Sequence, residues 1–308
     1  MKKPVKIFLI SVACLILLAF IGTFVTYLFI ANSVISEMAD IRVEKDDYTL
    51  DDFDLQGDRI TVTTEDDIEI NSYVIINPGA KANILLLHGM HGMDATSVFD
   101  YAKFLYDDGY SVISVDMRAH GKSGGENLSF GYLEVLDILA VIDYIKSHEV
   151  MSQKPIALYG LSMGASAAIN TAAYTQDISA VIAVSPFMSI QSQVRDYMSK
   201  DNSSDLFINS FMPAINMVLR TKFGISPKKQ SPIEEIRTYD NVPLFIMHGM
   251  SDTQTLYYHS QELYDNYNGQ KTLSLIENAD HLIVENVLSP QAIQYRNTIL
   301  DWLNSLFN

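Results

Sequence analysis

Cysteine is almost absent from this chain of 308 residues, and Cys14 is its single instance. An internal disulfide is therefore excluded, and beyond residue 14 the chain offers neither a cysteine nucleophile nor a thiolate metal site. The sequence also lacks an H-E-x-x-H metal motif, a phosphate-binding P-loop and a G-x-G-x-x-G dinucleotide motif. We therefore expect the protein to work without a metal and without a cofactor.

Basic residues are also scarce. The chain has 21 lysines and arginines against 37 aspartates and glutamates, which gives a formal net charge of −16. A charge of this sign repels nucleic acid and anionic lipid head groups. We therefore expect no nucleic-acid partner, and we expect any membrane contact to depend on a tether rather than on an adhesive surface.

Charge is missing altogether from residues 7–30, an apolar stretch of 24 residues. As a helix this stretch measures about 36 Å, which is enough to cross a hydrocarbon core of about 30 Å. Three lysines precede it and Glu37 and Asp40 follow it, so the positive-inside rule predicts a cytoplasmic N-terminus and an exported remainder. A cleaved signal peptide ending near residues 31–33 is the alternative, but its apolar region would be shorter. We expect a single-pass signal anchor in the cell membrane.

The pentapeptide Gly160-Leu161-Ser162-Met163-Gly164 stands between two different patterns. The β-like run 155–159 precedes it, and the small-residue run 165–169, which favours a helix, follows it. G-x-S-x-G in a strand–turn–helix context is the pattern of a nucleophile elbow. The flanking glycines let strand and helix pass closely while the serine sits on a strained turn. Ser162 is therefore the candidate nucleophile.

An acid and a base follow in order. Asp252 comes shortly after the apolar run 242–247, and His281 comes after the strand-like run 272–276. With these motifs and with Asp116–Ser123, which reads D-x-R-x-H-G-x-S, the segment 82–308 resembles the α/β-hydrolase superfamily. The resemblance is to its serine esterase, monoacylglycerol-lipase-like and aminopeptidase-like branches.

Strand-like and helix-like segments alternate between residues 82 and 184, and residues 59–77 show the alternation of an edge hairpin. Such a pattern predicts a mostly parallel central sheet with helices on both faces, and the resemblance implies the α/β-hydrolase fold. The expected organisation is a cytoplasmic N-terminus (1–6), a transmembrane anchor (7–30), a stalk (31–58) and a hydrolase domain (59–308) with a small helical lid insertion at about 186–240.

The alternation of strands and helices breaks within this insertion. Apolar residues recur at helical spacing from Leu206 to Leu219, and they are more numerous than one buried face requires. We expect a lid; a helix packed simply on the core is the alternative.

The resemblance implies a Ser-Asp-His triad. Ser162 attacks, His281 takes its proton as general base, and Asp252 holds the imidazole in the productive tautomer. The backbone N–H of Met163 is expected to form one half of an oxyanion hole. The resemblance assigns the other half to the N–H of Met90.

Other residues near this triad in the sequence motifs have expected roles of their own. We expect Asp116, at the end of a strand, to fix Arg118 and the loop that follows, and we expect His88, His120 and His248 to serve structural roles. His91 is an alternative contributor to the oxyanion hole through its side chain. With His91, the residues expected to line the substrate pocket are Met188, Met250 and Phe211.

The triad predicts acyl transfer to water but leaves the leaving group open. Methionines near the catalytic loops, an apolar lid and a membrane nearby favour esters of apolar acyl groups. We expect an exported, membrane-anchored carboxylesterase or lysophospholipase-like enzyme that acts on a small-molecule or lipid-like ester. The alternatives are a serine peptidase, thioesterase or acyltransferase on the same triad, or a non-catalytic, membrane-tethered binding module.

Overall fold

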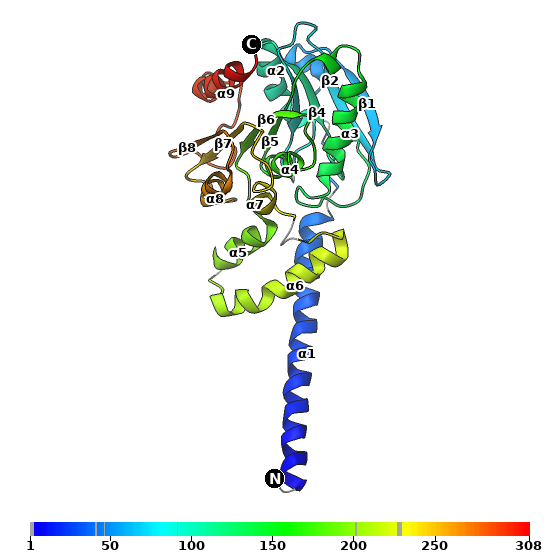
Figure 1. Ribbon diagram of the computed structural model, residues 1–308, viewed down its shortest axis with the longest axis vertical. Helices are drawn as coiled ribbons and strands as arrows, with labels where there is room; N and C mark the ends of the chain where they lie inside the picture. The colour runs from blue at the N-terminus through cyan, green and yellow to red at the C-terminus, as the bar shows by residue number, and fades with distance from the viewer. Residues whose placement is uncertain (1–2, 41, 46, 91, 201, 227–229) are drawn as a thin grey trace.

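A computed structural model describes residues 3–40, 42–45, 47–90, 92–200, 202–226 and 230–308. A layered α/β body occupies one end of the molecule, and the long helix α1 (Lys3–Ala39) projects from it (Figure 1). Within the described residues, α1 is the one helix long and apolar enough to cross a membrane. The body carries Ser162, Asp252 and His281, the candidate site residues.

The body is built on one eight-stranded sheet with the order β1-β2-β4-β3-β5-β6-β7-β8. Strand β2 runs antiparallel to both β1 and β4, and the neighbouring pairs from β4 to β8 are parallel. The expected mostly parallel sheet with an edge hairpin is thereby confirmed. The strands are β1 (Asp58–Thr63), β2 (Glu69–Ile75), β3 (Asn83–Leu87), β4 (Ser111–Val115), β5 (Ile156–Leu161), β6 (Ile178–Val184), β7 (Leu244–Gly249) and β8 (Lys271–Ile276).

Helices cover both faces of the sheet, as expected. The central strand β3 shows this directly, because Leu85 and Leu87 belong to one buried cluster while Ile84 and Leu86 belong to another. Side chains of a strand point alternately to its two faces, so each face has its own core. The helices of the body are α2 (Phe99–Asp107), α3 (Glu134–Ser147), α4 (Met163–Thr171), α8 (Tyr258–Asn266) and α9 (Ile293–Leu306).

The alternation breaks between β6 and β7, where the chain forms α5 (Ile190–Lys200), α6 (Asp205–Phe223) and the short α7 (Pro232–Glu235). Helix α6 is capped at its N-terminus by Ser204, whose side chain accepts the Phe207 N–H, and at its C-terminus by Gly224 with φ +68°. Both helices α5 and α6 lie between the body and the projecting part of α1 (Figure 1).

The segment expected as a stalk differs from that expectation at its start. Helix α1 continues past residue 30 to Ala39, and the side chains of Ala31, Ile35 and Ala39 are fully buried. Beyond the helix, the Val43 N–H donates to Ala119 O at 3.0 Å and Val43 O accepts from the Gly121 N–H at 2.6 Å. The uncharged run ends at residue 30, but the helix does not end with it. Residues 31–39 stay helical, with side chains packed against the rest of the protein.

Candidate active site

Ser162 lies at the sharp turn between β5 and α4. Its φ is +52°, a conformation that L-residues rarely adopt outside strained functional turns. A Cβ at Gly160 would lie 2.2 Å from Gly164 O, and one at Gly164 would lie 2.3 Å from Leu87 O. Glycine is therefore required on both sides of the serine, and this explains the two glycines of the G-x-S-x-G motif.

Three side chains from three separate loops form one hydrogen-bonded chain. The Ser162 hydroxyl donates to His281 Nε2 at 2.9 Å, and His281 Nδ1 donates to Asp252 Oδ2 at 2.6 Å. The three residues are only 8 %, 9 % and 3 % exposed, respectively. This arrangement can move a proton from the hydroxyl to the imidazole while the carboxylate balances the positive charge.

Asp252 is held at both carboxylate oxygens. Its Oδ1 accepts the backbone N–H groups of Gln254 at 2.8 Å and Thr255 at 2.9 Å, while Oδ2 accepts from His281 and also from His248 Nε2 at 3.0 Å. Burial works to raise the pKa of Asp252, but the hydrogen bonds from His248 and His281 hold it well below its ordinary value. Asp252 is therefore an ionised partner for the histidine.

His248 was expected to be structural, and the structure places it in direct contact with the acid. Its Nδ1 faces the Ser260 hydroxyl at 2.6 Å, and its Nε2 also lies 3.0 Å from Thr255 O. With carboxylate and carbonyl acceptors on one side, Nε2 is the protonated nitrogen and Nδ1 accepts from Ser260. The sequence signal for this contact is the i, i+4 spacing of His248 and Asp252 across a tight turn.

The backbone around His281 fixes the position of its ring. The Ser185 hydroxyl donates to the carbonyl of His281, and the carboxylate of Asp280 accepts the His281 N–H at 2.8 Å. Asp280 thus supports the loop, while Asp252 contacts the ring. Ser185 was missed in the sequence, since a serine at a strand end carries no pattern that distinguishes it.

The loop after β3 lies beside the elbow. A Cβ at Gly89 would be 3.5 Å from Ser162 Cβ, so the segment that contains Met90 runs along the serine. Met163 begins α4, where first-turn N–H groups have no acceptor within the helix. These positions suit two backbone donors aimed at one anion. His91, the alternative contributor, lies outside the described residues.

Two buried histidines brace this loop. His88 Nδ1 donates to Gly89 O at 2.7 Å, its Nε2 accepts the Met117 N–H at 3.1 Å, and its ring lies 4.6 Å from that of His120. Burial, together with the neighbouring His120, lowers the pKa of His88 to about 3. A neutral His88 therefore ties the loop after β3 to the loop after β4.

Asp116 fixes the loop that follows β4 by accepting the N–H groups of Ala95 at 2.7 Å and Lys122 at 2.9 Å. The expectation that it also fixes Arg118 is wrong. The Arg118 guanidinium is instead bound by Asp137 of α3 at 2.7 Å and by Asp66 at 2.8 Å. The partner from α3 could not be predicted locally, because the contact depends on how that helix packs against the sheet.

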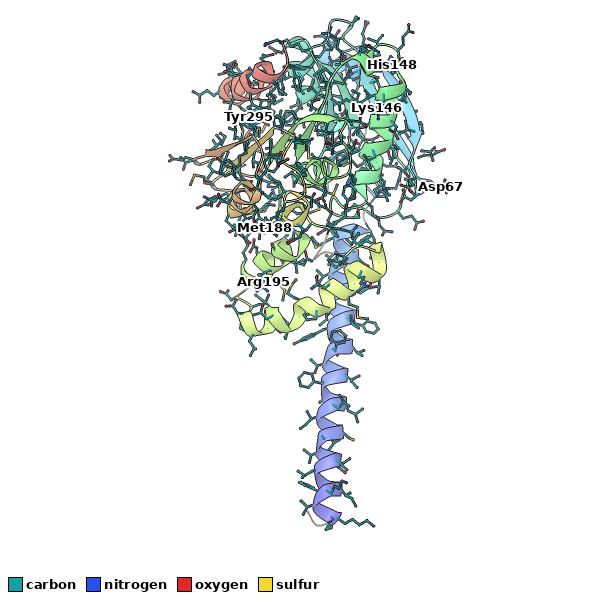
Figure 2. The ribbon with its side chains drawn as sticks, viewed as in Figure 1. Asp67, Lys146, His148, Met188, Arg195 and Tyr295 are labelled. Atoms are coloured by element: carbon teal, nitrogen blue, oxygen red, sulfur yellow. The ribbon has the colours of Figure 1, made fainter. Side chains whose placement is uncertain are left out.

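The residues predicted to line a substrate pocket are dispersed. Met188 is half-buried between the body and α5 (Figure 2), and Met250 is 40 % exposed on the loop after β7. Phe211 is buried, and its ring lies 5.4 Å from that of Tyr27 in α1. Phe211 therefore contributes to the contact between α6 and α1, and a role for these residues around substrate stays a prediction.

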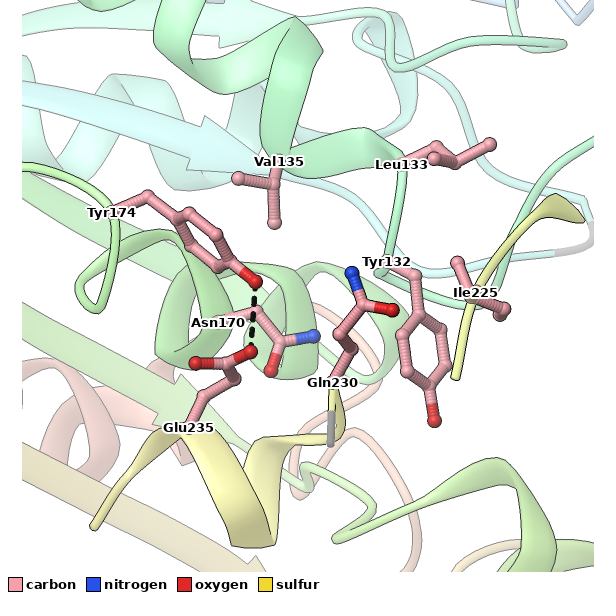
Figure 3. A pocket seen from close by; sticks show the side chains of 8 residues that line it. All are labelled: Tyr132, Leu133, Val135, Asn170, Tyr174, Ile225, Gln230 and Glu235. Atoms are coloured by element: carbon pink, nitrogen blue, oxygen red, sulfur yellow. Dashed lines mark hydrogen bonds between the residues drawn. The ribbon is translucent and has the colours of Figure 1, made fainter. Parts of the chain in front are cut away.

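A small cavity of about 30 Å³ lies where the end of the insertion meets α3 and α4 (Figure 3). The Tyr174 hydroxyl donates across it to Glu235 Oε1 at 2.8 Å. Burial raises the pKa of Glu235. Ser162 and His281 do not line this cavity. Its lining consists of Tyr132, Leu133, Val135, Asn170, Tyr174, Ile225, Gln230 and Glu235.

Among the described residues, no group of three or more histidine, cysteine, aspartate or glutamate side chains is placed to hold a metal ion. The chemistry that the site itself can support is that of the buried hydrogen-bonded chain from Asp252 to Ser162, next to backbone donors of the elbow.

Comparison with known proteins adds a family to this geometry. Residues 78–238 match the family model described as serine aminopeptidase, S33. The Bacillus subtilis (strain 168) protein YqkD is 25 % identical over 240 residues, which is 77 % of this chain and 76 % of that protein. The Schizosaccharomyces pombe protein bem46 is 28 % identical over 148 residues, 46 % of this chain and 48 % of that protein.

The fold is shared with solved hydrolases. The structure of the Pyrococcus furiosus esterase Pf2001 superposes with a TM-score of 0.70 over 88 % of this chain and 99 % of that chain, at 22 % sequence identity. The sheet order, the turn at Ser162 and the family model are each those of an α/β-hydrolase. The chain therefore belongs to the serine aminopeptidase S33 family within the α/β-hydrolase superfamily, and it is a hydrolase.

Proposed function

We propose that this protein is a membrane-anchored serine hydrolase that cleaves carboxylic esters of apolar acyl groups through Ser162, His281 and Asp252. The observation that carries the proposal is the hydrogen-bonded chain from Asp252 through His281 to a serine on a strained elbow. Each polar atom of that chain faces the partner that proton transfer requires.

The reaction follows from these contacts. As Ser162 Oγ attacks the ester carbonyl, His281 Nε2 takes its proton, and Asp252 stabilises the imidazolium. The N–H groups of Met163 and Met90 stabilise the oxyanion, each contributing about 10²–10³ in rate. His281 returns its proton to the leaving alcohol, and an acyl-enzyme remains. Water, activated by His281, then attacks the acyl-enzyme and releases the acid.

We further propose that α1 is a signal anchor, with residues 1–6 cytoplasmic and the body outside the membrane. Support comes from its large apolar side chains, which are exposed along the helix from Val5 to Ile30, as lipid contact requires. The acidic body gains nothing from anionic head groups, so the anchor supplies membrane attachment.

Two features favour an apolar acyl group. The insertion next to the anchor is apolar, and the side chain of Met250, in the loop that contains Asp252, is exposed. A peptide substrate is the second candidate, because the family model is described as a serine aminopeptidase. The two differ in what the site must recognise beside the carbonyl: an apolar chain in one case and a charged amino terminus in the other.

The test is hydrolysis of p-nitrophenyl esters from acetate to palmitate by the full chain in detergent, beside aminoacyl p-nitroanilides. We expect ester turnover with an optimum at apolar acyl chains, and a loss of about 10⁶-fold in kcat for Ser162→Ala. Ser152→Ala, which removes an exposed serine away from the elbow, is the matched control and should keep full activity. Turnover of the anilides alone would favour the peptidase, and unchanged activity of Ser162→Ala would remove the triad assignment.

A further inference from the structure

The helices α1 and α6 are packed against each other, although residues 40–204 separate them in the sequence. The Tyr27 ring meets the rings of Phe207 and Phe211 edge-on, with centroids 5.8 Å and 5.4 Å apart. The Tyr27 hydroxyl also lies 3.2 Å from the hydroxyl of Ser210. The first half of α6 is therefore in contact with α1 at the level of Tyr27.

The other end of α6 is held further along α1. The Lys222 ammonium lies 2.7 Å from the carboxylate of Asp40 and donates to the Ser36 hydroxyl at 3.0 Å. Between the two ends, Ile35 of α1 is fully buried. Residues 27 and 40 are about 20 Å apart along a helix, so α6 crosses α1 obliquely with its first half nearer the apolar part of α1 (Figure 1).

The depth of this contact follows from the length of the anchor. The uncharged run begins at Ile7, and about 20 helical residues cross the hydrocarbon core, which places the far boundary near Tyr27. Tyrosine is enriched at that boundary, where its ring is apolar and its hydroxyl is wet. The first half of α6 therefore lies at the level of the membrane surface.

The side of α6 that faces outward is suited to that position. Leu206 is 82 % exposed and Met217 is 46 % exposed, and with the exposed Pro213 they lie along one face of the helix. Phe207 beside them is 41 % exposed. Residues 206–219 carry no charge, although the chain as a whole has a net charge of −16. An uncharged, apolar helical face of this kind is unusual on a surface that meets only water.

We propose that the first half of α6 seats in the head-group boundary of the bilayer that α1 spans, with Leu206 and Phe207 as the inserted side chains. The inference rests on the anchor proposed above. The partner is a neutral or zwitterionic lipid surface, because the chain's negative charge offers anionic head groups no attraction. Interfacial helices bury their apolar side by about 5–10 Å, a depth that side chains at the level of Tyr27 reach.

The consequence for catalysis is a route for substrate. Helix α5 begins at Ile190. The loop before it is hydrogen-bonded to α4, because the Ser166 hydroxyl donates to Phe187 O at 3.0 Å. The insertion therefore connects the membrane-facing helix to the segment next to Ser162. An ester held in the same leaflet would reach the site from this side of the body.

The test uses the full chain reconstituted into phosphatidylcholine vesicles with or without brominated acyl chains, which quench tryptophan on contact. Trp302 is the single natural tryptophan and lies in α9, so the wild type supplies the background. Three variants are compared: Phe20→Trp in the anchor, Leu206→Trp in α6, and Val150→Trp. Val150 is 42 % exposed. It is two residues after His148, which lies at the end of the body far from α1 (Figure 2).

We expect strong quenching for Phe20→Trp, intermediate quenching for Leu206→Trp, and no more than the wild-type background for Val150→Trp. Quenching of Leu206→Trp should persist at high salt, since apolar insertion is not screened. If Phe20→Trp is quenched and Leu206→Trp matches Val150→Trp, the seating of α6 is wrong while the anchor stands. If Phe20→Trp is not quenched either, the anchor itself is wrong and the inference falls with it.

Discussion

At the level of single residues, Asp252 has more hydrogen-bond partners than His281 alone. Asp252 accepts four hydrogen bonds, two of them from histidines at the same oxygen, Oδ2. Its lowered pKa means that this carboxylate contributes stability above its unfolded pKa of about 3.9. That contribution is lost only as the pH falls through the lower folded value.

We therefore expect His248 to be a positioning residue, whose loss slows catalysis through Asp252. Because His248→Phe keeps a ring but removes the donor to Asp252, kcat should fall by about tenfold with KM unchanged. His248→Gln, which restores an N–H, should recover part of that loss. Steady-state kinetics of both variants are the measurement. An equal loss in both, with a matching fall in thermal stability, would mean that His248 only supports the fold.

The candidate triad could be proposed from the sequence because Ser162, Asp252 and His281 each follow a strand-like run in a fixed order, and the ends of parallel strands meet at one edge. The contacts of His248 and Ser185 could not be predicted. Each depends on where a side chain turns within a loop, and that is decided by packing rather than by periodicity.

At the scale of elements, the elbow is a junction with no room for a side chain at either flanking glycine. A Cβ at Gly164 would lie 2.3 Å from Leu87 O and 2.6 Å from His88 O, so α4 approaches the end of β3 too closely for any side chain at this position. Gly164→Ala should push them apart, lower the free energy of unfolding by about 1–3 kcal/mol, and reduce ester hydrolysis by displacing the donors. Urea denaturation and the ester assay check both effects.

The matched control is Gly79→Ala, where the added Cβ would meet Asn77 Oδ1 at 3.7 Å and no positive φ is required. Its stability and activity should stay close to those of the wild type. Equal effects at Gly79 and Gly164 would contradict the claim that the elbow is specially constrained.

Strands and helices of the body were predicted to within a few residues because buried apolar runs and helical spacing repeat locally. The end of α1 could not be predicted in this way, because residues 31–39 carry few large apolar side chains. These residues are in a helix that packs against α6, which is distant in the sequence. A contact between Tyr27 and Phe211 leaves no local pattern in either segment.

At the scale of the whole molecule, the anchor and the insertion form one structural unit. Deleting residues 1–26 removes most of the exposed apolar helix but keeps Tyr27 to Ala39 on α6, whereas deleting residues 1–39 uncovers the buried face of α6. The shorter deletion should yield a monodisperse protein. The longer deletion should lower the melting temperature by about 5 °C or more, because buried side chains such as Ile35 are lost. Thermal unfolding and gel filtration distinguish the two; equal stability would show that the helical contact contributes nothing.

The proposed function requires Ser162 to be a nucleophile that His281 activates, and covalent labelling reports on both residues. The full chain in detergent is treated with a fluorophosphonate, and the modified residue is identified by peptide mass spectrometry. We expect a single adduct on Ser162, with labelling lost in Ser162→Ala and strongly slowed in His281→Gln. A folded protein that does not label, or that labels at another serine, would show that Ser162 is not the activated nucleophile.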